Sequence, residues 1–227
     1  MPTLATARLI LRGVTEADAS AIQKNFDDYE IIRHLATIVP WPYPPDGARN
    51  FLAMILPAQG KDRWVWGLFL QHAPEELIGI VDLRRGEREN RGFWLARRFW
   101  GQGLMTEATE AVTECAFTAL GFETLTLTNA LGNTRSRRVK ETAGAVWLRT
   151  EPARFVDPAY TEREVWMLSK AAWMARRAGA SRPRLSNLLS RYESGAGIPF
   201  RPEEQKADSQ AANADHFGEH VESGNGV

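Results

Sequence analysis

The sequence predicts an α/β (α+β) fold, a mixed sheet of about six to seven strands flanked by helices. Three strand-like runs follow one another between residues 63 and 96 with short turn-like spacers, as in an antiparallel meander. A helix follows from about Leu104 to Leu120, with apolar residues at helical spacing. Strands and helices then alternate to about residue 170, which places helices on the faces of the sheet.

The chain before the meander supplies one strand and two helices. The short apolar run from Arg8 to Arg12 is typical of a strand. Thr15 with Asp18 three residues later resembles a capping box, which predicts a helix through about Asn25. Asp46 is placed to cap a second helix. One face of that helix carries the apolar residues Phe51, Leu52, Ile55 and Leu56.

The later elements follow from periodicity and from glycines that end helices. The meander comprises residues 63–70, 76–83 and 91–96, with spacers at 72–74 and 86–90. Gly121 ends the long helix, and Gly144 ends a shorter one at 134–143. Further strands are predicted at 124–128, 145–149 and 164–168.

The composition separates one domain from its C-terminal extension. The folded domain is predicted to cover residues 1–170. Residues 171–194 form a basic, helix-prone extension, and Gly, Pro, Ser, Asn and acids dominate residues 195–227. Such a segment buries too little apolar surface to offset its ordering entropy, so a disordered tail is predicted.

The charge and cysteine content exclude several classes of protein. Lys and Arg number 28, as do Asp and Glu, so no electrostatic signature for nucleic acid or an anionic membrane arises. No run approaches the roughly 20 apolar residues of a membrane helix. The single cysteine, Cys115, cannot form an internal disulfide, and a cytoplasmic protein is expected. The four histidines show no metal-ligand spacing, so no metal is expected.

A glycine-containing turn between a strand and a helix is the strongest local signal. Arg98-Phe99-Trp100-Gly101-Gln102-Gly103 connects the strand at 91–96 to the long helix. Unpaired N–H groups and the helix dipole make such a turn an anion site, and Arg97 and Arg98 add positive charge. The P-loop pattern is absent, and Thr106 stands where the dinucleotide fingerprint needs glycine. A plain tight turn is the alternative reading. The nearby Glu107, Glu110 and Glu114 are expected on a solvated helix face.

Several motifs together resemble one family, over about residues 6–170. They are Ala7-Arg8-Leu9-Ile10-Leu11-Arg12, Trp41-Pro42-Tyr43-Pro44, Leu77-Ile78-Gly79-Ile80-Val81-Asp82-Leu83, Gly92-Phe93-Trp94-Leu95, Trp100-Gly101-Gln102-Gly103 with Thr106-Glu107-Ala108, and Asn133-Thr134-Arg135-Ser136 followed by Val139, Glu141 and Gly144. In order and spacing, they resemble the GNAT superfamily of N-acetyltransferases, in the branch of the ribosomal-protein N-terminal alanine acetyltransferases.

The resemblance implies a central sheet that splays at residues 92–96 and a site for acetyl-CoA as co-substrate. Free main-chain groups near Leu95 and Ala96 would bind the pantetheine arm, and Asn133 would hold it. Ser136 would lie near the thioester sulfur. The pyrophosphate would be bound by the amides of Gly101, Gln102, Gly103 and Leu104, beside Arg98. From the residues alone, Asn133 and Ser136 could serve as a helix cap and a first-turn residue. The cations Arg135, Arg137, Arg138 and Lys140 could meet a phosphate or form a solvated face.

The expected function is acetyl transfer to a primary amine by direct attack in a ternary complex. The acceptor is a protein N-terminus or a small molecule. Ser136 would protonate the leaving thiolate. Many relatives carry a glutamate before the Gly-Phe/Tyr-Trp-Leu strand, where this chain has Asn90 and Arg91, so Glu89 is the candidate base, with Asp82 and Glu87 nearby. A non-catalytic acyl-CoA sensor is the alternative. The protein is expected to be a monomer or homodimer without nucleic-acid or membrane partners.

Overall fold

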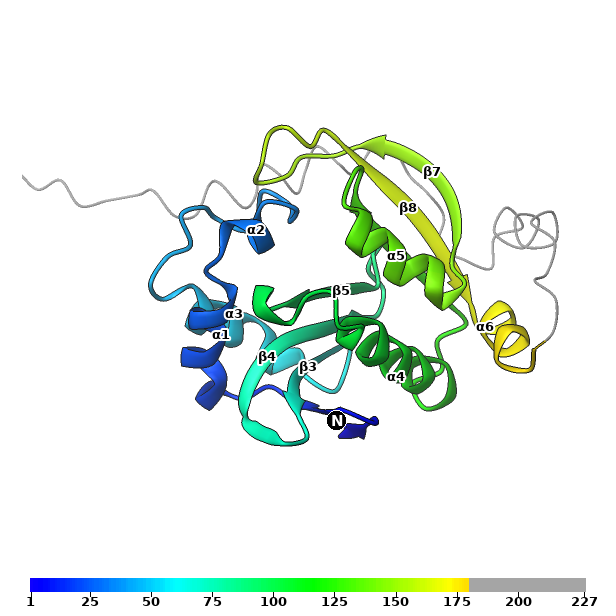
Figure 1. The fold of residues 1–227 in the computed structure, drawn as a ribbon, viewed down its shortest axis with the longest axis horizontal. Coiled ribbons are helices and arrows are strands. Elements are labelled where there is room, and N and C mark those ends of the chain that lie inside the picture. Colours follow the sequence, from blue (N-terminus) through cyan, green and yellow to red (C-terminus); the bar gives the residue numbers. More distant parts are fainter. Residues whose placement is uncertain (180–227) are drawn as a thin grey trace, which may run out of the picture. The chain divides into compact units, whose positions relative to one another are not determined.

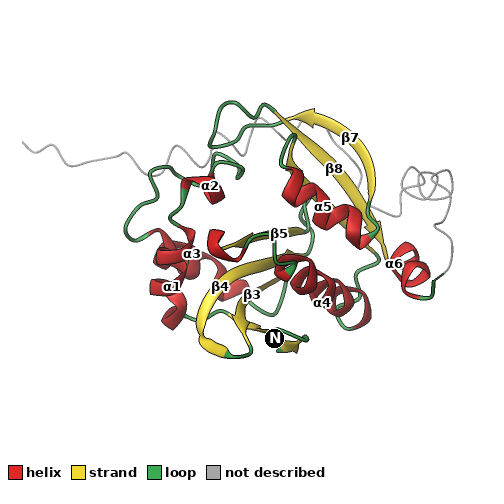
Figure 2. Ribbon diagram, in the orientation of Figure 1, coloured by secondary structure: helices red, strands yellow, loops and turns green. Residues whose placement is uncertain are grey.

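A computed structural model describes residues 1–179 of the chain. In these residues eight strands form one sheet in the order β1-β2-β3-β4-β5-β6-β8-β7 (Figures 1 and 2). They are β1 Leu4–Ala5, β2 Leu9–Gly13, β3 Arg63–Leu70, β4 Ala73–Arg84, β5 Arg91–Leu95, β6 Thr124–Ala130, β7 Val146–Pro152 and β8 Glu162–Ser169. The predicted fold class is confirmed. The strand count exceeds six to seven because the two-residue β1 pairs with β2.

The helices lie close to predicted positions, except for the four-residue helix Tyr29–Ile32, which the sequence did not predict. They are α1 Ala19–Phe26, α2 Tyr29–Ile32, α3 Gly47–Ile55, α4 Leu104–Thr118, α5 Thr134–Ala143 and α6 Lys170–Arg177. The predicted capping interaction before α1 is confirmed, since the Thr15 amide donates to Asp18 Oδ2 at 2.8 Å. Gly144 ends α5 in the left-handed conformation at φ 84°, which a glycine adopts without a steric penalty.

Two hydrophobic cores lie on opposite faces of the sheet. Helices α4 and α5 cover one face, and α1, α2 and α3 cover the other (Figure 1). The first core includes Leu68, Val81, Ala108, Val112 and Val139. The second includes Ile22, Ile32, Leu52, Val65 and Phe69. Because successive strand residues point to opposite faces, Val65 and Leu68 of the same strand serve different cores.

The sheet divides between β5 and β6. This is the one parallel contact among the described strands, and its register contains a single pair, Arg91 with Leu127. On its other side β5 pairs with β4 along its whole length, from Arg91 to Leu95. Strand β6 likewise pairs with β8 over seven residues. Beyond Arg91, therefore, no described strand covers the second edge of β5.

Helix α6 packs against α4 and extends the folded region past Lys170. The Trp173 indole is 4% exposed within the first core, and its N–H donates to Glu110. Arg176 also pairs with Glu110, and Arg177 pairs with Glu114 at 2.8 Å. Glu114 is exposed, as expected of a solvated helix face. The expectation is wrong for Glu110 and Glu107, whose side chains are partly buried and pair with Arg176 and Arg8. The predicted tail at 195–227 and the rest of the extension lie outside the described residues.

No helix in the described part of the chain has the length and apolar character needed to cross a membrane.

Candidate functional site

The turn before α4 has the backbone that its glycines predict. Gly101 and Gly103 adopt φ values of 78° and 76°, which only glycine reaches readily. A Cβ at Gly101 would meet nothing within 4 Å, and one at Gly103 would touch only Arg8 at 3.6 Å. The glycines are therefore required by conformation rather than by crowding within the protein. Space remains for a ligand directly over the main chain.

The start of α4 offers unpaired amides. Gly103 is the N-cap, and its carbonyl accepts from the Glu107 amide at 3.1 Å. Amides of the first helical turn have no partner within their own helix. In the described part of the chain, no hydrogen bond uses the amides of Gly101, Gln102, Gly103 or Leu104. These four donors, with the positive end of the α4 dipole, can bind an anion.

The uncovered edge of β5 is formed by Phe93 and Leu95. The Ala96 amide donates to the Ile78 carbonyl of β4 at 2.8 Å, and its carbonyl accepts from Phe99. The prediction of free main-chain groups at Ala96 is therefore wrong. Strand alternation turns the main-chain groups of Phe93 and Leu95 the other way, toward the side that β6 leaves open. An extended ligand can add to this edge as a strand does.

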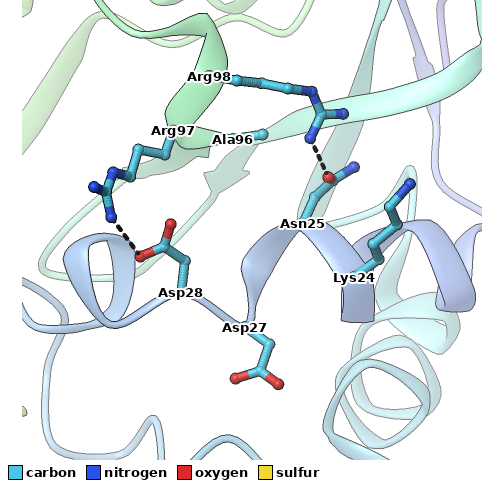
Figure 3. Close-up of a pocket in the computed structure, with 7 residues that line it drawn as sticks. All are labelled: Lys24, Asn25, Asp27, Asp28, Ala96, Arg97 and Arg98. Atoms are coloured by element: carbon cyan, nitrogen blue, oxygen red, sulfur yellow. Dashed lines mark hydrogen bonds and ion pairs between the residues drawn. The ribbon is translucent and has the colours of Figure 1, made fainter.

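The Arg98 side chain is engaged with Asn25 and Glu76 rather than with the predicted phosphate site. Its guanidinium donates to Asn25 Oδ1 at 2.9 Å and to Glu76, so its charge is already partnered (Figure 3). The neighbouring Arg97 lies 3.8 Å from Asp28. Both arginines line a polar surface pocket of mixed charge with Lys24, Asn25, Asp27, Asp28 and Ala96. The two arginine charges are therefore already paired with carboxylates outside or within this pocket rather than directed at the glycine turn.

Trp100 and Arg135 connect the glycine turn to α5. The Trp100 indole N–H donates to the Leu95 carbonyl at 2.7 Å. The Arg135 guanidinium lies 4.1 Å above the centre of the Trp100 ring, within cation–π range. These contacts place the N-terminus of α5 beside the end of β5.

Asn133 and Ser136 form the first turn of α5. The Asn133 side chain accepts from the Ser136 amide at 3.1 Å, as an N-cap does. This bond uses Oδ1, so the Asn133 Nδ2 donors stay available for a ligand. The Ser136 hydroxyl accepts from Lys140 Nζ at 2.8 Å. Both side chains are partly exposed.

Lys140 is a site residue that the sequence pattern did not reveal. Its side chain is only 2% exposed. The sequence alone groups Lys140 with the neighbouring arginines, as a cation that binds phosphate or lies on a solvated helix face. Burial, assisted by the charge of Arg91, lowers the pKa of the Lys140 amine to about 7. One signal was present in the sequence: Lys140 follows Ser136 by four residues, so both lie on one helix face.

The acid candidates occupy different environments. Glu89 is partly buried beside the β5–β6 junction, where it accepts a hydrogen bond from the Thr128 hydroxyl of β6. Asp82 forms two hydrogen bonds with Arg63, at 2.8 and 3.0 Å, so it is a structural anion. Glu87 is exposed. Glu89 alone of these three combines partial burial with proximity to the site.

Arg91 occupies the junction itself and is buried. Its Nη1 donates to Thr113 Oγ1 of α4 at 2.9 Å, and its side chain is 3% exposed. Its Nε and Nη2 are buried without a hydrogen-bond partner. Burial lowers the pKa of this guanidinium to about 10. A fixed positive charge thus lies where the pattern of relatives suggested an acid.

The structure brings most of the predicted site residues to one place, where β5, the glycine turn and α5 meet. These are Leu95, Gly101, Gln102, Gly103, Leu104, Asn133 and Ser136. Arg98 faces the pocket beside α1, and Ala96 is fully bonded within the protein. Among residues 1–179, no group of three or more His, Cys, Asp or Glu could hold a metal ion.

Known proteins share this architecture. The model of the acetyltransferase (GNAT) domain matches residues 8–146, more than half of the chain. YdaF of Bacillus subtilis (strain 168), whose name provisionally describes a ribosomal N-acetyltransferase, is 30% identical over 104 residues. The match covers 43% of this chain and 56% of YdaF, so the chain spans little more than half of that relative.

Solved structures show the same fold. The ribosomal-protein-S5-alanine acetyltransferase of Vibrio fischeri matches with a TM-score of 0.66 at 15% identity, over 76% of this chain and 99% of that one. RimL, a ribosomal L7/L12 α-N-protein acetyltransferase solved with coenzyme A, matches with a TM-score of 0.64 at 17% identity, over 74% and 98%. The family model covers well over half of the chain. The chain therefore belongs to the acetyltransferase (GNAT) family, as its motifs predicted.

Proposed function

We propose that the protein transfers the acetyl group of acetyl-CoA to a primary amine, in a ternary complex and without a covalent enzyme intermediate. The observation that carries the proposal is the open edge of β5 beside the unpaired amides of α4. An extended pantetheine arm fits the edge, and a diphosphate fits the amides of Gly101, Gln102, Gly103 and Leu104. The names of YdaF and RimL support a protein N-terminus as acceptor, with a small amine as the alternative.

The chain supplies positioning, polarisation and proton transfer. Bound acetyl-CoA would supply the acetyl thioester. Holding both reactants in one cleft contributes roughly 7–11 kcal/mol through proximity and orientation. The main-chain N–H of Leu95, on the open edge of β5, is placed to polarise the acetyl carbonyl. Asn133 caps α5 through its Oδ1, which leaves its Nδ2 to hold the pantetheine arm. Ser136 donates the proton that the leaving sulfur requires.

Glu89 is proposed as the group that removes the proton from the amine. Glu89 is partly buried at the β5–β6 junction, and its charge is close enough to Lys140 on α5 to favour the protonated form of that amine. The hydrogen bond from Thr128 fixes one of its carboxylate oxygens. The second oxygen remains for the amine or a water molecule. The amine must be neutral to attack, so this step precedes bond formation.

Two matched glycine variants test the cofactor site. Gly103→Ala and Gly121→Ala both place a Cβ on a positive φ, 76° and 71°, and neither new atom clashes. Each variant should lose a similar stability, about 1–2 kcal/mol. Only Gly103→Ala should weaken CoA binding in calorimetry, because Gly121 lies after α4, away from the turn. Equal CoA affinity in both variants would refute the site.

Catalysis is tested by measuring thiol release from acetyl-CoA with a panel of amines, including peptides with free N-termini. The expected result is thiol release with at least one class of amine. CoA binding without thiol release would support the alternative, a non-catalytic acyl-CoA sensor. The substitution of Asn90 and Arg91 for the usual acid is the feature that favours that alternative. The expected cytoplasmic location and the monomeric or homodimeric state remain predictions.

A further inference from the structure

A buried lysine lies directly behind the proposed proton donor. Lys140 Nζ donates to the Ser136 hydroxyl at 2.8 Å and to the Ser136 carbonyl at 3.3 Å. It lies 5.5 Å from the centre of the Phe93 ring. Phe93 belongs to the open edge of β5, so the Lys140–Ser136 pair lies beside the strand that would hold the pantetheine arm.

Charged groups surround Lys140 from each neighbouring element. Arg91 of β5 opposes its positive charge, while Glu89, ahead of β5, and Glu164 of β8 favour it. Glu164 is itself committed elsewhere, because it accepts from Asn129 of β6 at 2.8 Å and from Arg137 of α5 at 3.2 Å. Burial outweighs the two acids, and the pKa of Lys140 is lowered to about 7.

A purely structural role explains this arrangement poorly. Buried lysines in proteins ordinarily pair with a carboxylate, because an unpaired buried charge is strongly unfavourable. In the described residues, the hydrogen bonds of Lys140 go only to the hydroxyl and carbonyl of Ser136. An apolar side chain of similar length would fill the same space without a desolvation penalty. The buried lysine therefore lowers the stability of the fold, and it does so next to the hydroxyl that is proposed to donate a proton, that of Ser136.

We propose, on the basis of the acetyl transfer proposed above, that Lys140 is a positioning residue that supplies Ser136 with the proton released to the leaving sulfur. The Lys140–Ser136 hydrogen bond runs in the required direction, from the amine to the hydroxyl oxygen. That bond leaves the Ser136 O–H free to donate toward the cleft. A group with a pKa near 7 gives up and regains a proton readily at neutral pH.

The proton balance closes without a further reactant. As the amine nitrogen bonds to the acetyl carbon, the bond from that carbon to sulfur breaks. The sulfur takes the Ser136 hydroxyl proton, and Ser136 takes one from Lys140 Nζ. The nitrogen, already neutral when it attacks because Glu89 has passed its first proton to solvent, loses one more proton to Glu89. This second proton returns through solvent to Lys140. One amine and one thioester thus give one amide and one thiol, with Ser136 and Lys140 restored.

The variants Lys140→Met, Ser136→Ala and their combination test the relay by kinetics. Wild-type kcat should decline above about pH 7 as Lys140 loses its proton. Lys140→Met should lower kcat about 100-fold, leave the KM for acetyl-CoA unchanged and abolish that decline. Ser136→Ala should lower kcat similarly, and the double variant should be no worse than either single one. Lys61→Met, at an exposed lysine, should behave as wild type.

A titration of the lysine ¹³Cε resonances by NMR provides a readout independent of turnover. One resonance should titrate near pH 7, vanish in Lys140→Met and move in Ser136→Ala. The relay is overturned if the Lys140 resonance titrates at its ordinary pKa or if Lys140→Met keeps the decline of kcat. Absence of thiol release by the wild type with every amine would refute the proposed function and the relay together, whereas turnover with a normal Lys140 titration would refute the relay alone.

Discussion

Replacing Lys140 by methionine should stabilise the protein, and the gain should depend on pH. The fall of the Lys140 pKa from 10.5 to about 7 corresponds to about 5 kcal/mol in favour of the neutral amine. Below about pH 7 the folded protein carries the buried ammonium, so the whole penalty applies. Methionine has a similar length and no proton to lose, so it escapes this penalty.

The sign of the pH dependence follows from proton binding. Between about pH 7 and 10.5 the unfolded chain binds a proton on Lys140 that the folded protein does not. The free energy of unfolding of the wild type therefore rises with pH by about 1.4 kcal/mol per unit in this window. The methionine variant lacks this increase. Its advantage over the wild type is thus largest near neutral pH and disappears as the pH passes the unfolded pKa.

Urea unfolding of both proteins at about pH 7 and about pH 9.5 measures the effect. The difference in unfolding free energy should shrink by about 3 kcal/mol between the two conditions. Other titrating groups cancel in this difference, because both proteins carry them. Lys61→Met, at an exposed lysine, provides the control and should show a difference that is independent of pH. A pH-independent difference for Lys140→Met would refute the burial of a charge at this position.

Two further substitutions test the packing around the site. Phe117→Ala should destabilise the protein by about 3–5 kcal/mol in urea unfolding, because the ring is 1% exposed and packs, tilted, against Trp173 at 5.6 Å between centroids; a loss below about 1 kcal/mol would show that α6 does not complete this core. Trp100→Phe should lower the unfolding free energy by about 1 kcal/mol, since it removes the 2.7 Å hydrogen bond to the Leu95 carbonyl; an unchanged thermal midpoint would contradict that contact.

The course of the chain could be predicted wherever a pattern is local. Periodicity and the glycines at 121 and 144 gave α4 and α5 nearly to the residue. The two-residue β1 could not be found, because it is held by main-chain pairing and lacks any periodic pattern. The second strand of the meander begins at Ala73, within the predicted spacer. Pro74 is tolerated there because it is the second residue of the strand, where a missing N–H costs little pairing.

The candidate site was less accessible than the fold. The glycine turn follows from two residues and their neighbours, so sequence alone could suggest it. The direction of each main-chain group in β5 depends on its register with β4, which no local pattern specifies. The free groups therefore lie at Phe93 and at the Leu95 amide rather than at Ala96, while the Leu95 carbonyl accepts from Trp100. The burial of Lys140 similarly depends on which face of α5 meets β5, a tertiary fact.

The docking of α6 sets a lower limit on the length of chain that folds correctly. A protein shortened at Lys170 would lose the Trp173 indole from the interior and uncover the apolar side of α4 near Phe117. It would also leave Glu110 and Glu114 without their arginine partners. The helix that carries the four anion-binding amides at one end would then be unsupported at the other. Any shortened version intended for binding studies should therefore retain α6 in full.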